Sequence, residues 1–285
     1  MNVKAYGLRG CIHNMQLTTA VENVLVVKIG GARGLDIERC ADDIARLDRP
    51  LVLVHGASGM MDALCQERGI PIRTLTSPTG HSSRYTDPAT REVFVEACER
   101  VNAEWVRLLG ERGVRAHGLT GAEVPIWGER KTAVRAVVDG RVRIVRDDFS
   151  GSITHVQSNT ILATLATGQV AVVPPLANSV DGFLNIDGDR AGAAVAGSIS
   201  AADYLILSAV RGLYRNFPDE NSFIPSVNAR EIDTALGYAE GRMKRKVIGA
   251  AEALAAGVQR VIIGDGRAHA PIHAALNGAG TEFSR

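Results

Sequence analysis

The feature that most constrains the fold is a repeated unit in which a short, uninterrupted apolar run ends in glycines. The first unit is VLVVKIGG, residues 24 to 31, and the second is LVLVHGASG, residues 51 to 59. A helical pattern follows each unit, from Asp36 to Leu47 and then to about Arg68. Strands that are apolar at every position are buried on both faces, which is typical of parallel strands joined through helices.

Three further apolar runs continue this pattern later in the chain. They cover residues 170 to 173, 204 to 207 and 261 to 263, and helical patterns alternate with them. Alternating strands and helices predict an α/β protein with a largely parallel sheet. Pro174 and Pro175, followed by polar residues, mark an expected junction between two lobes.

The composition indicates a globular protein with no global signal for a charged partner. The chain has 285 residues, of which 46% are hydrophobic and 22% charged, with a net charge of +1, so any basic signal must be local. The four cysteines form no CxxC pair, so neither a zinc site nor a disulfide framework is expected. No apolar run reaches the roughly 20 residues that span a bilayer, and the first 22 residues lack the core of a signal peptide. We therefore expect a cytoplasmic protein.

Positive charge gathers locally at the start of a predicted helix. The run GRMKRKVIGAAEAL contains Arg242, Lys244, Arg245 and Lys246 just before an alanine-rich segment. Cations in the first turn of a helix oppose its macrodipole, so we expect an anion nearby.

A second basic segment reads TAVRAVVDGRVRIV and predicts an antiparallel hairpin that turns at Asp139 and Gly140. Its local charge is +5, because six cations face one aspartate. The cations are Arg130, Lys131, Arg135, Arg141, Arg143 and Arg146. Either they meet an acidic partner or they protect an exposed sheet edge from aggregation.

The glycine loops form a candidate anion site. Lys28 precedes Gly30 and Gly31 at the end of the first strand, and Gly56 and Gly59 follow the second. Neighbouring parallel strands place such loops side by side, where backbone N–H groups can approach a phosphate. The alternative is a tight turn with an exposed lysine.

The common nucleotide fingerprints are missing from the sequence. It contains neither GxxxxGK[ST] nor a well-placed GxGxxG, so a nucleotide must be held in another way. We expect His55 to be packed at a strand end rather than to act as a base.

Two other polar stretches contribute candidates. LNIDGDRAG places Asn185, Asp187 and Asp189 before a helix of small residues, where the aspartates either contact lysines or substrate, or cap the helix. In SSRYTD, Arg84 either binds a carboxylate through its planar guanidinium or pairs with Asp87.

Together, KIGG, HGASG, SRYTD, NIDGD and GRMKRK resemble the amino acid kinase family in content and order. The phrases SRYTD, RKTAV, GRMKRKV and IIGDGR are more similar to kinases for aminoadipate or glutamate on an amino-group carrier protein than to acetylglutamate kinases. The resemblance covers approximately Val24 to Phe283. It leaves residues 1–22 as an N-terminal extension.

The resemblance implies a three-layer α/β/α sandwich of two lobes. Residues 23–182 would bind the acyl substrate and the carrier, with the basic hairpin at 130–147, and residues 183–285 would bind ATP. Lys28 and Lys246 would bind the transferring phosphoryl group, and Asp189 would orient both. The implied substrate contacts are Gly30, Gly31, Gly56, Ala57, Arg84 and Asn185. The implied nucleotide contacts are Ser208, Val210, Gly212, Leu213, Met243 and Lys244. The docking contacts would be the six hairpin cations.

The implied activity is phosphorylation of the side-chain carboxylate of carrier-bound 2-aminoadipate or glutamate by ATP with Mg²⁺, giving an acyl phosphate in lysine or arginine biosynthesis. A carboxylate with a pKa of about 4.3 is ionised near neutrality and needs no general base. The alternative is a kinase for free N-acetylglutamate. An anion sensor or nucleic-acid binder is disfavoured because only 5% of the residues are aromatic.

The sequence leaves several properties open. Aminoadipate and glutamate differ by one methylene, which a pocket distinguishes by about 1–3 kcal/mol. The partner would be a small acidic carrier protein and the assembly a homodimer, as is usual in the family, with no nucleic acid, membrane or protein-bound metal. The sequence has Ala57 where relatives commonly carry glycine, and Arg211 where proline is frequent.

Overall fold

One mixed sheet forms the centre of the molecule. The computed structural model describes residues 21–31, 34–78, 80, 82–138 and 140–285. Within them the strand order is β16-β18-β17-β13-β1-β2-β10-β5, parallel throughout except for the antiparallel β17–β18 pair. The strands are β1 (Leu25–Ile29), β2 (Leu51–His55), β5 (Ala116–Gly118), β10 (Val170–Val173), β13 (Asp203–Ser208), β16 (Ser226–Asn228), β17 (Arg260–Asp265) and β18 (Thr281–Ser284). The α/β prediction is confirmed.

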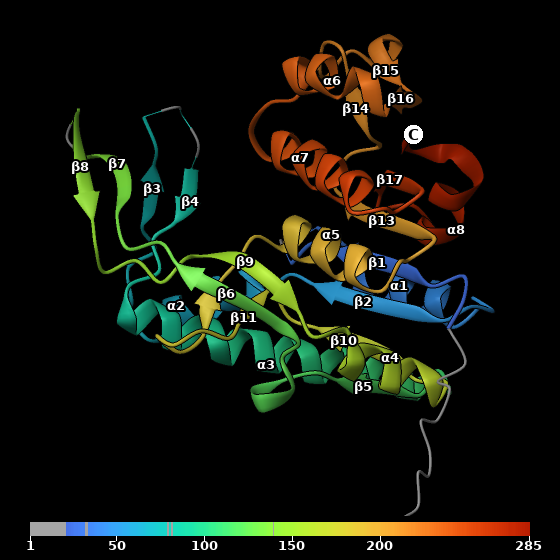
Figure 1. Cartoon of the computed structure of the whole chain (residues 1–285), viewed down its shortest axis with the longest axis horizontal. Coiled ribbons are helices and arrows are strands. Elements are labelled where there is room, and N and C mark those ends of the chain that lie inside the picture. The colour runs from blue at the N-terminus through green and yellow to red at the C-terminus, as the bar shows by residue number, and fades with distance from the viewer. Residues whose placement is uncertain (1–20, 32–33, 79, 81, 139) are drawn as a thin grey trace, which may run out of the picture.

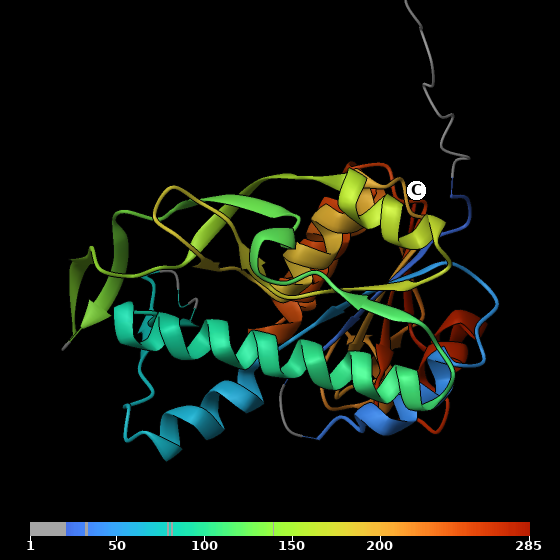
Figure 2. The same cartoon turned by 90° about the horizontal axis from the view of Figure 1, so that it is seen from below.

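Helices cover both faces of this sheet, because residues along each central strand point alternately to opposite sides. Val24 and Val26 pack in one core with α4, α5 and α7, whereas Leu25 and Val27 pack in another with α1, α3 and α8. These layers are visible in Figures 1 and 2. The helices are α1 (Ile37–Ile44), α2 (Ser58–Glu67), α3 (Pro88–Glu111), α4 (Ser158–Ala166), α5 (Gly188–Ser198), α6 (Ile232–Tyr238), α7 (Gly241–Ala255) and α8 (Pro271–Ala274).

Helix α1 is shorter than the sequence pattern predicts. Asp36 is its N-cap rather than its first residue, and the helix ends at Ile44 instead of Leu47. A 3.0 Å hydrogen bond from Leu47 N to the Ile44 carbonyl tightens the chain into a turn there. Pro50 follows shortly afterwards, and a proline excludes continued helix.

Two antiparallel hairpins, β3–β4 and β7–β8, project from the half of the molecule that contains β2, β10 and β5. In Figure 1, β3–β4 and β7–β8 stand next to each other at one end of the molecule. The predicted hairpin is confirmed: Gly140 has a φ of +72°, as its turn requires, and Asp139 lies outside the described residues. The pairs are β3 (Thr74–Thr76) with β4 (Ser82–Arg84), β6 (Ile126–Arg130) with β9 (Gly151–Val156), β7 (Val134–Val138) with β8 (Arg141–Val145), β11 (Leu176–Ala177) with β12 (Leu184–Asn185), and β14 (Leu213–Tyr214) with β15 (Phe223–Ile224).

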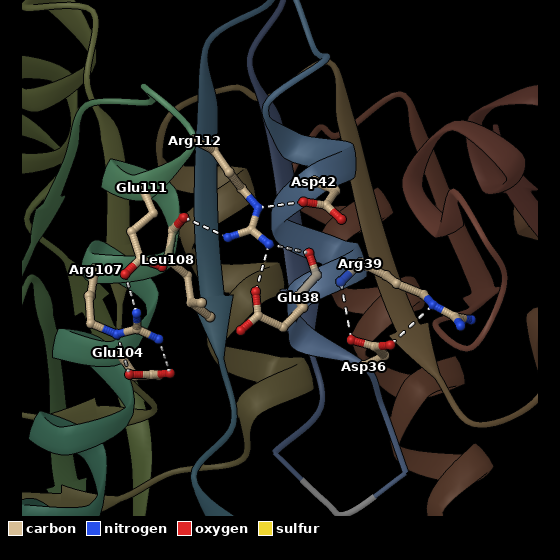
Figure 3. Close-up of polar contacts among 9 residues, drawn as sticks. All are labelled: Asp36, Glu38, Arg39, Asp42, Glu104, Arg107, Leu108, Glu111 and Arg112. Carbon is tan, nitrogen blue, oxygen red and sulfur yellow. Dashed lines mark hydrogen bonds and ion pairs between the residues drawn. The ribbon is translucent and has the colours of Figure 1, made fainter.

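Arg112 fastens α1 to the C-terminal end of α3 (Figure 3). Its guanidinium donates to Asp42 and Glu38 of α1, each at 2.6 Å, and to the Leu108 carbonyl of α3 at 2.9 Å. Because one planar group binds acceptors of three residues from two helices, it fixes their relative position on this face of the sheet. Among the described residues, no helix combines the length and apolarity needed to cross a bilayer.

Candidate active site

Two lysines from distant parts of the chain meet one buried aspartate. Lys28 Nζ lies 2.7 Å from Asp189 Oδ1, and Lys246 Nζ lies 3.1 Å from Asp189 Oδ2. Lys28 is on β1, Asp189 is in the first turn of α5, and Lys246 is in the second turn of α7. The three residues are only 8%, 5% and 8% exposed. The cluster therefore holds an excess of one positive charge, which suits an incoming anion.

The ionisation of these groups depends on their mutual contact. Burial alone would raise the pKa of Asp189, but the charges of Lys28 and Lys246 outweigh burial and hold that pKa at about 2. The pKa of Lys246 is lowered by burial and by the nearby charge of Lys28, and Asp189 opposes both effects. The single negative charge of Asp189 balances only one of the two ammonium groups. A bound phosphoryl group would supply the negative charge that is missing.

The two aspartates of NIDGD have separate roles in the structure. Asp187 is the N-cap of α5 and accepts hydrogen bonds from the backbone N–H groups of Asp189 and Arg190 at 3.0 and 3.1 Å. This leaves the Asp189 carboxylate free for the lysines. Gly188 makes room for one of them, since a Cβ there would lie 3.2 Å from Lys28 Cε. Both alternatives from the sequence are therefore realised, one by each aspartate.

The two glycine loops lie against each other at the carboxyl edge of β1 and β2. A Cβ on Gly31 would lie 2.2 Å from the Gly56 carbonyl carbon, and a Cβ on Gly56 would lie 2.3 Å from Gly31 N. Gly59 N also donates to the Gly31 carbonyl at 2.7 Å. Only residues without a side chain permit this backbone approach. Ala57 has a φ of −124°, so its methyl group causes no strain at this position.

His55, which ends β2, is packed as expected. It is buried, and its Nε2 lies 3.3 Å from Asn102 Nδ2. Burial lowers its pKa to about 4, so the ring is neutral near neutral pH.

Of the two terminal nitrogens of the Arg84 guanidinium, one has a partner among the described residues and the other is open, that is, without one. Its Nη2 pairs with Asp62 of α2, while Nη1 is buried and has no hydrogen-bond partner among the described residues. Asp87, the alternative partner, instead caps α3 through Thr90 N and pairs with Arg73. An open guanidinium nitrogen of this kind fits a ligand carboxylate.

Asn185 ends β12, and the sequence predicts it, like Arg84, to be a substrate contact. Its Nδ2 donates to Thr86 Oγ1 at 2.9 Å, and its backbone N–H donates to the Phe149 carbonyl at 2.9 Å. These bonds orient the amide side chain in the half-buried turn before α5.

Two supporting residues could not be recognised from the sequence. Tyr204 of β13 is buried beneath α5 and donates from its hydroxyl to the Asp189 carbonyl at 2.7 Å. Gly192 leaves space for this ring, because a Cβ there would lie 2.4 Å from the tyrosine oxygen.

Arg245 is the second of these supporting residues. It donates to the Ser82 carbonyl of β4 and lies 3.5 Å from Asp187. For Arg245, its position next to Lys246 was the only signal.

The predicted nucleotide residues follow β13 and open α7. Leu213 N donates to Thr281 Oγ1 at 2.8 Å, and Gly212 permits this contact, since a Cβ there would lie 2.3 Å from the same oxygen. Ser208 ends β13, Val210 is in the following loop, and Met243 and Lys244 are in the first turn of α7. Arg211 donates to the Ala279 carbonyl at 3.2 Å, and its guanidinium lies 3.9 Å from the Phe223 ring centroid.

The hairpin cations divide into two groups. Arg130 is engaged within the molecule: its Nε donates to the Asp148 carbonyl at 3.0 Å, and its guanidinium lies 4.0 Å from the Phe149 ring centroid. The other five are exposed, namely Lys131, Arg135, Arg141, Arg143 and Arg146.

Among the described residues, no cluster of three or more His, Cys, Asp and Glu side chains is suited to hold a metal ion.

Solved structures share this fold. The chain superposes on N-acetylglutamate synthase from Neisseria gonorrhoeae, solved with coenzyme A and N-acetyl-glutamate, with a TM-score of 0.74 and 26% identity; the match covers 92% of this chain and 59% of that one. Carbamate kinase from Giardia lamblia, bound to AMP-PNP, gives a TM-score of 0.66 at 16% identity and covers 94% of this chain and 99% of that one. The three-layer α/β/α architecture is confirmed.

Curated relatives match along most of their length. A protein from Deinococcus radiodurans named "[LysW]-aminoadipate kinase" is 42% identical over 93% of this chain and 92% of its own length. A protein of the same name from Thermus thermophilus is 40% identical over 90% of this chain and 99% of its own length. Residues 23–265 match the family model described as "Amino acid kinase family". The buried two-lysine cluster on an α/β/α sandwich thus occurs in a chain that belongs to the amino acid kinase family.

Proposed function

We propose that this protein transfers the γ-phosphoryl group of ATP to the side-chain carboxylate of 2-aminoadipate attached to an amino-group carrier protein. The observation that carries the proposal is the placement of Lys28 and Lys246 on opposite oxygens of Asp189. The names of relatives that are 42% and 40% identical to the chain support this acceptor. The product would be an acyl phosphate for the reductive step of lysine biosynthesis.

The transfer needs charge neutralisation more than proton transfer. The acceptor carboxylate has a reference pKa of about 4.3 and is already a nucleophile at neutral pH. Lys28 and Lys246 would contact the transferring group from two sides, and Asp189 would keep both ammonium groups in place. ATP would supply the phosphoryl group, and a Mg²⁺ ion would neutralise part of the negative charge on its phosphates. His55 takes no part in this chemistry, since it is buried and neutral.

The surrounding groups fit the two substrates. The paired loops at Gly31 and Gly56 expose backbone at the edge of the sheet where the lysines lie. The open Nη1 of Arg84 would bind the free carboxylate of the amino acid, and Asn185 would be a second contact to this end of the substrate.

We further propose the division of the chain that the family resemblance implies. Residues 23–182 would hold the acyl substrate and the carrier, with Gly30 and Ala57 among its substrate contacts, and residues 183–285 would hold ATP. The nucleotide contacts would be Ser208, Val210, Gly212, Leu213, Met243 and Lys244. The resemblance also supports a homodimer, and the composition of the sequence supports a cytoplasmic location.

Trapping the acyl phosphate tests the proposal. The enzyme is incubated with MgATP, hydroxylamine and one of three acceptors, which are carrier-bound aminoadipate, carrier-bound glutamate and free N-acetylglutamate. Mass spectrometry should detect a hydroxamate on carrier-bound aminoadipate, and Lys246→Ala should remove it. Hydroxamate formed only on free N-acetylglutamate, or on no acceptor, would refute the proposed function.

A further inference from the structure

The β7–β8 hairpin has two chemically different faces. In an antiparallel pair, residues directly opposite each other lie on the same face. Ala136 belongs to the inner face; it is fully buried, and β7 contacts β3. The outer face consists of Val137 opposite Val142 and Arg135 opposite Ile144.

This outer face exposes three large apolar side chains. Val137, Val142 and Ile144 are 40%, 50% and 55% exposed. Single exposed hydrophobic residues are ordinary, but three neighbours on one face of a projecting hairpin indicate a surface that another molecule covers. Figure 1 shows that the hairpin projects from the N-terminal half of the molecule.

Positive charge lies on the same hairpin as the apolar residues. Arg135 shares their face, and Lys131 and Arg146 are exposed at the flanks of the hairpin. Arg141 and Arg143 are also exposed, but the register places them on the opposite face, with Ala136. Arg130 does not contribute, because its guanidinium is used within the molecule. An apolar centre with a charged rim is the usual composition of a protein interface. The complementary surface has an apolar centre and an acidic rim.

We propose that Val137, Val142 and Ile144 form the apolar centre of the surface that binds the acidic amino-group carrier protein. This inference rests on the proposed function and adds to it which residues provide affinity for the carrier protein. The exposed cations accelerate and orient the encounter, whereas the apolar contact supplies binding that salt does not screen. The neighbouring β3–β4 hairpin carries Arg84, so the carrier would dock at the same end of the molecule as the open guanidinium.

The test measures carrier binding without turnover. Aminoadipate-bearing carrier is titrated calorimetrically into the wild type and into the double variant Val142→Thr/Ile144→Thr, at about 0.1 M and 1 M NaCl. Threonine retains β-branching, so the hairpin should keep its conformation. We expect the double variant to bind roughly tenfold more weakly at both salt concentrations. The Michaelis constant for ATP should not change.

Two controls separate the apolar from the charged contribution. Val180→Thr changes a fully exposed valine outside the hairpin and should bind like the wild type. Arg141→Glu/Arg143→Glu should weaken binding at 0.1 M salt and lose most of its effect at 1 M, where the screening length is only about 3 Å.

Unchanged carrier affinity in the threonine variant, with its fold verified by circular dichroism, would overturn the inference. So would a threonine variant that loses self-association in sedimentation while it binds the carrier normally, because the face would then join two copies of this chain. Neither result touches the proposed activity, since the hydroxamate assay tests it separately.

Discussion

The guanidinium of Arg245 donates a hydrogen bond to the main-chain carbonyl of Ser82, which ties α7 to the β3–β4 hairpin. The same guanidinium lies 3.5 Å from Asp187, the cap of α5. Arg245 therefore connects three segments that surround the buried cluster. It directly precedes Lys246, so a loss of these contacts would release the helix turn that carries this lysine.

Replacing Arg245 should uncouple the two parts of the site. Hydrogen bonds from a charged donor contribute about 1.5–3 kcal/mol, so Arg245→Ala should lower kcat/KM for the acyl substrate by roughly tenfold or more. Steady-state kinetics with each substrate varied would measure this. Arg242→Ala, an exposed neighbour on the same helix turn, is the control. Equal kinetics of the two variants would contradict the connecting role of Arg245.

Asp189→Asn should damage both activity and stability. The amide keeps the shape but leaves two buried ammonium groups without a counter-charge, which costs about 3–5 kcal/mol of unfolding free energy. Turnover should fall at least about 10²-fold, because the lysines lose their orientation. Urea denaturation and the hydroxamate assay measure the two effects.

Asp187→Asn provides the matched control for that variant. Asparagine caps helices as well as aspartate does, so the start of α5 should remain intact and stability should change by only a few tenths of a kcal/mol. If both variants lose similar stability, the division of roles between the two aspartates is wrong.

Gly31→Ala should reduce activity without unfolding the protein. The added methyl group would lie 2.2 Å from the backbone of Gly56, so one loop must move by about 1 Å. A displacement of that size near reacting groups costs about 10² in rate. Ala57→Gly, which removes a methyl group from the same pair of loops, should retain activity. Full activity of Gly31→Ala would show that the loops need not touch.

Buried His55 should make the protein less stable in mild acid. Its pKa is about 4 when folded against 6.5 when unfolded, so the unfolded chain binds the proton first as the pH falls. The stability that the neutral ring provides is complete above pH 6.5 and is lost between about 6.5 and 4, at most about 3 kcal/mol. Urea midpoints across this range should fall less steeply for His55→Gln. Identical pH dependence would contradict a strongly lowered pKa.

Much of the fold could be predicted because it depends on local pattern. Apolar strands ending in glycine specify both β1–β2 and the contact between their loops. The Asp139–Gly140 pair specifies the hairpin turn, and the cations at Arg242 to Lys246 do open a helix. Each of these depends on residues close in the sequence.

Partner choice among side chains could not be predicted in the same way. Arg84 pairs with Asp62 rather than with Asp87, which is closer in the sequence. The guanidinium of Arg130 packs on the Phe149 ring instead of facing solvent. Such contacts depend on how separate elements pack, and the sequence does not indicate which of several charged neighbours comes within reach. The same applies to the contact between Arg245 and Ser82.

The start of α7 has a consequence for the order of events during catalysis. Among the described residues, no side chain caps this helix, and its first two turns hold four cations at the end where the peptide dipoles are positive. The first turn of this helix, ahead of the anchored Arg245 and Lys246, should fray in the empty enzyme and become ordered when phosphates bind. ATP would then act as the missing cap and complete the turn that precedes Lys246. Amide hydrogen exchange at Met243 and Lys244 should slow when ATP is added, and exchange that ATP leaves unchanged would show that the turn is ordered from the outset.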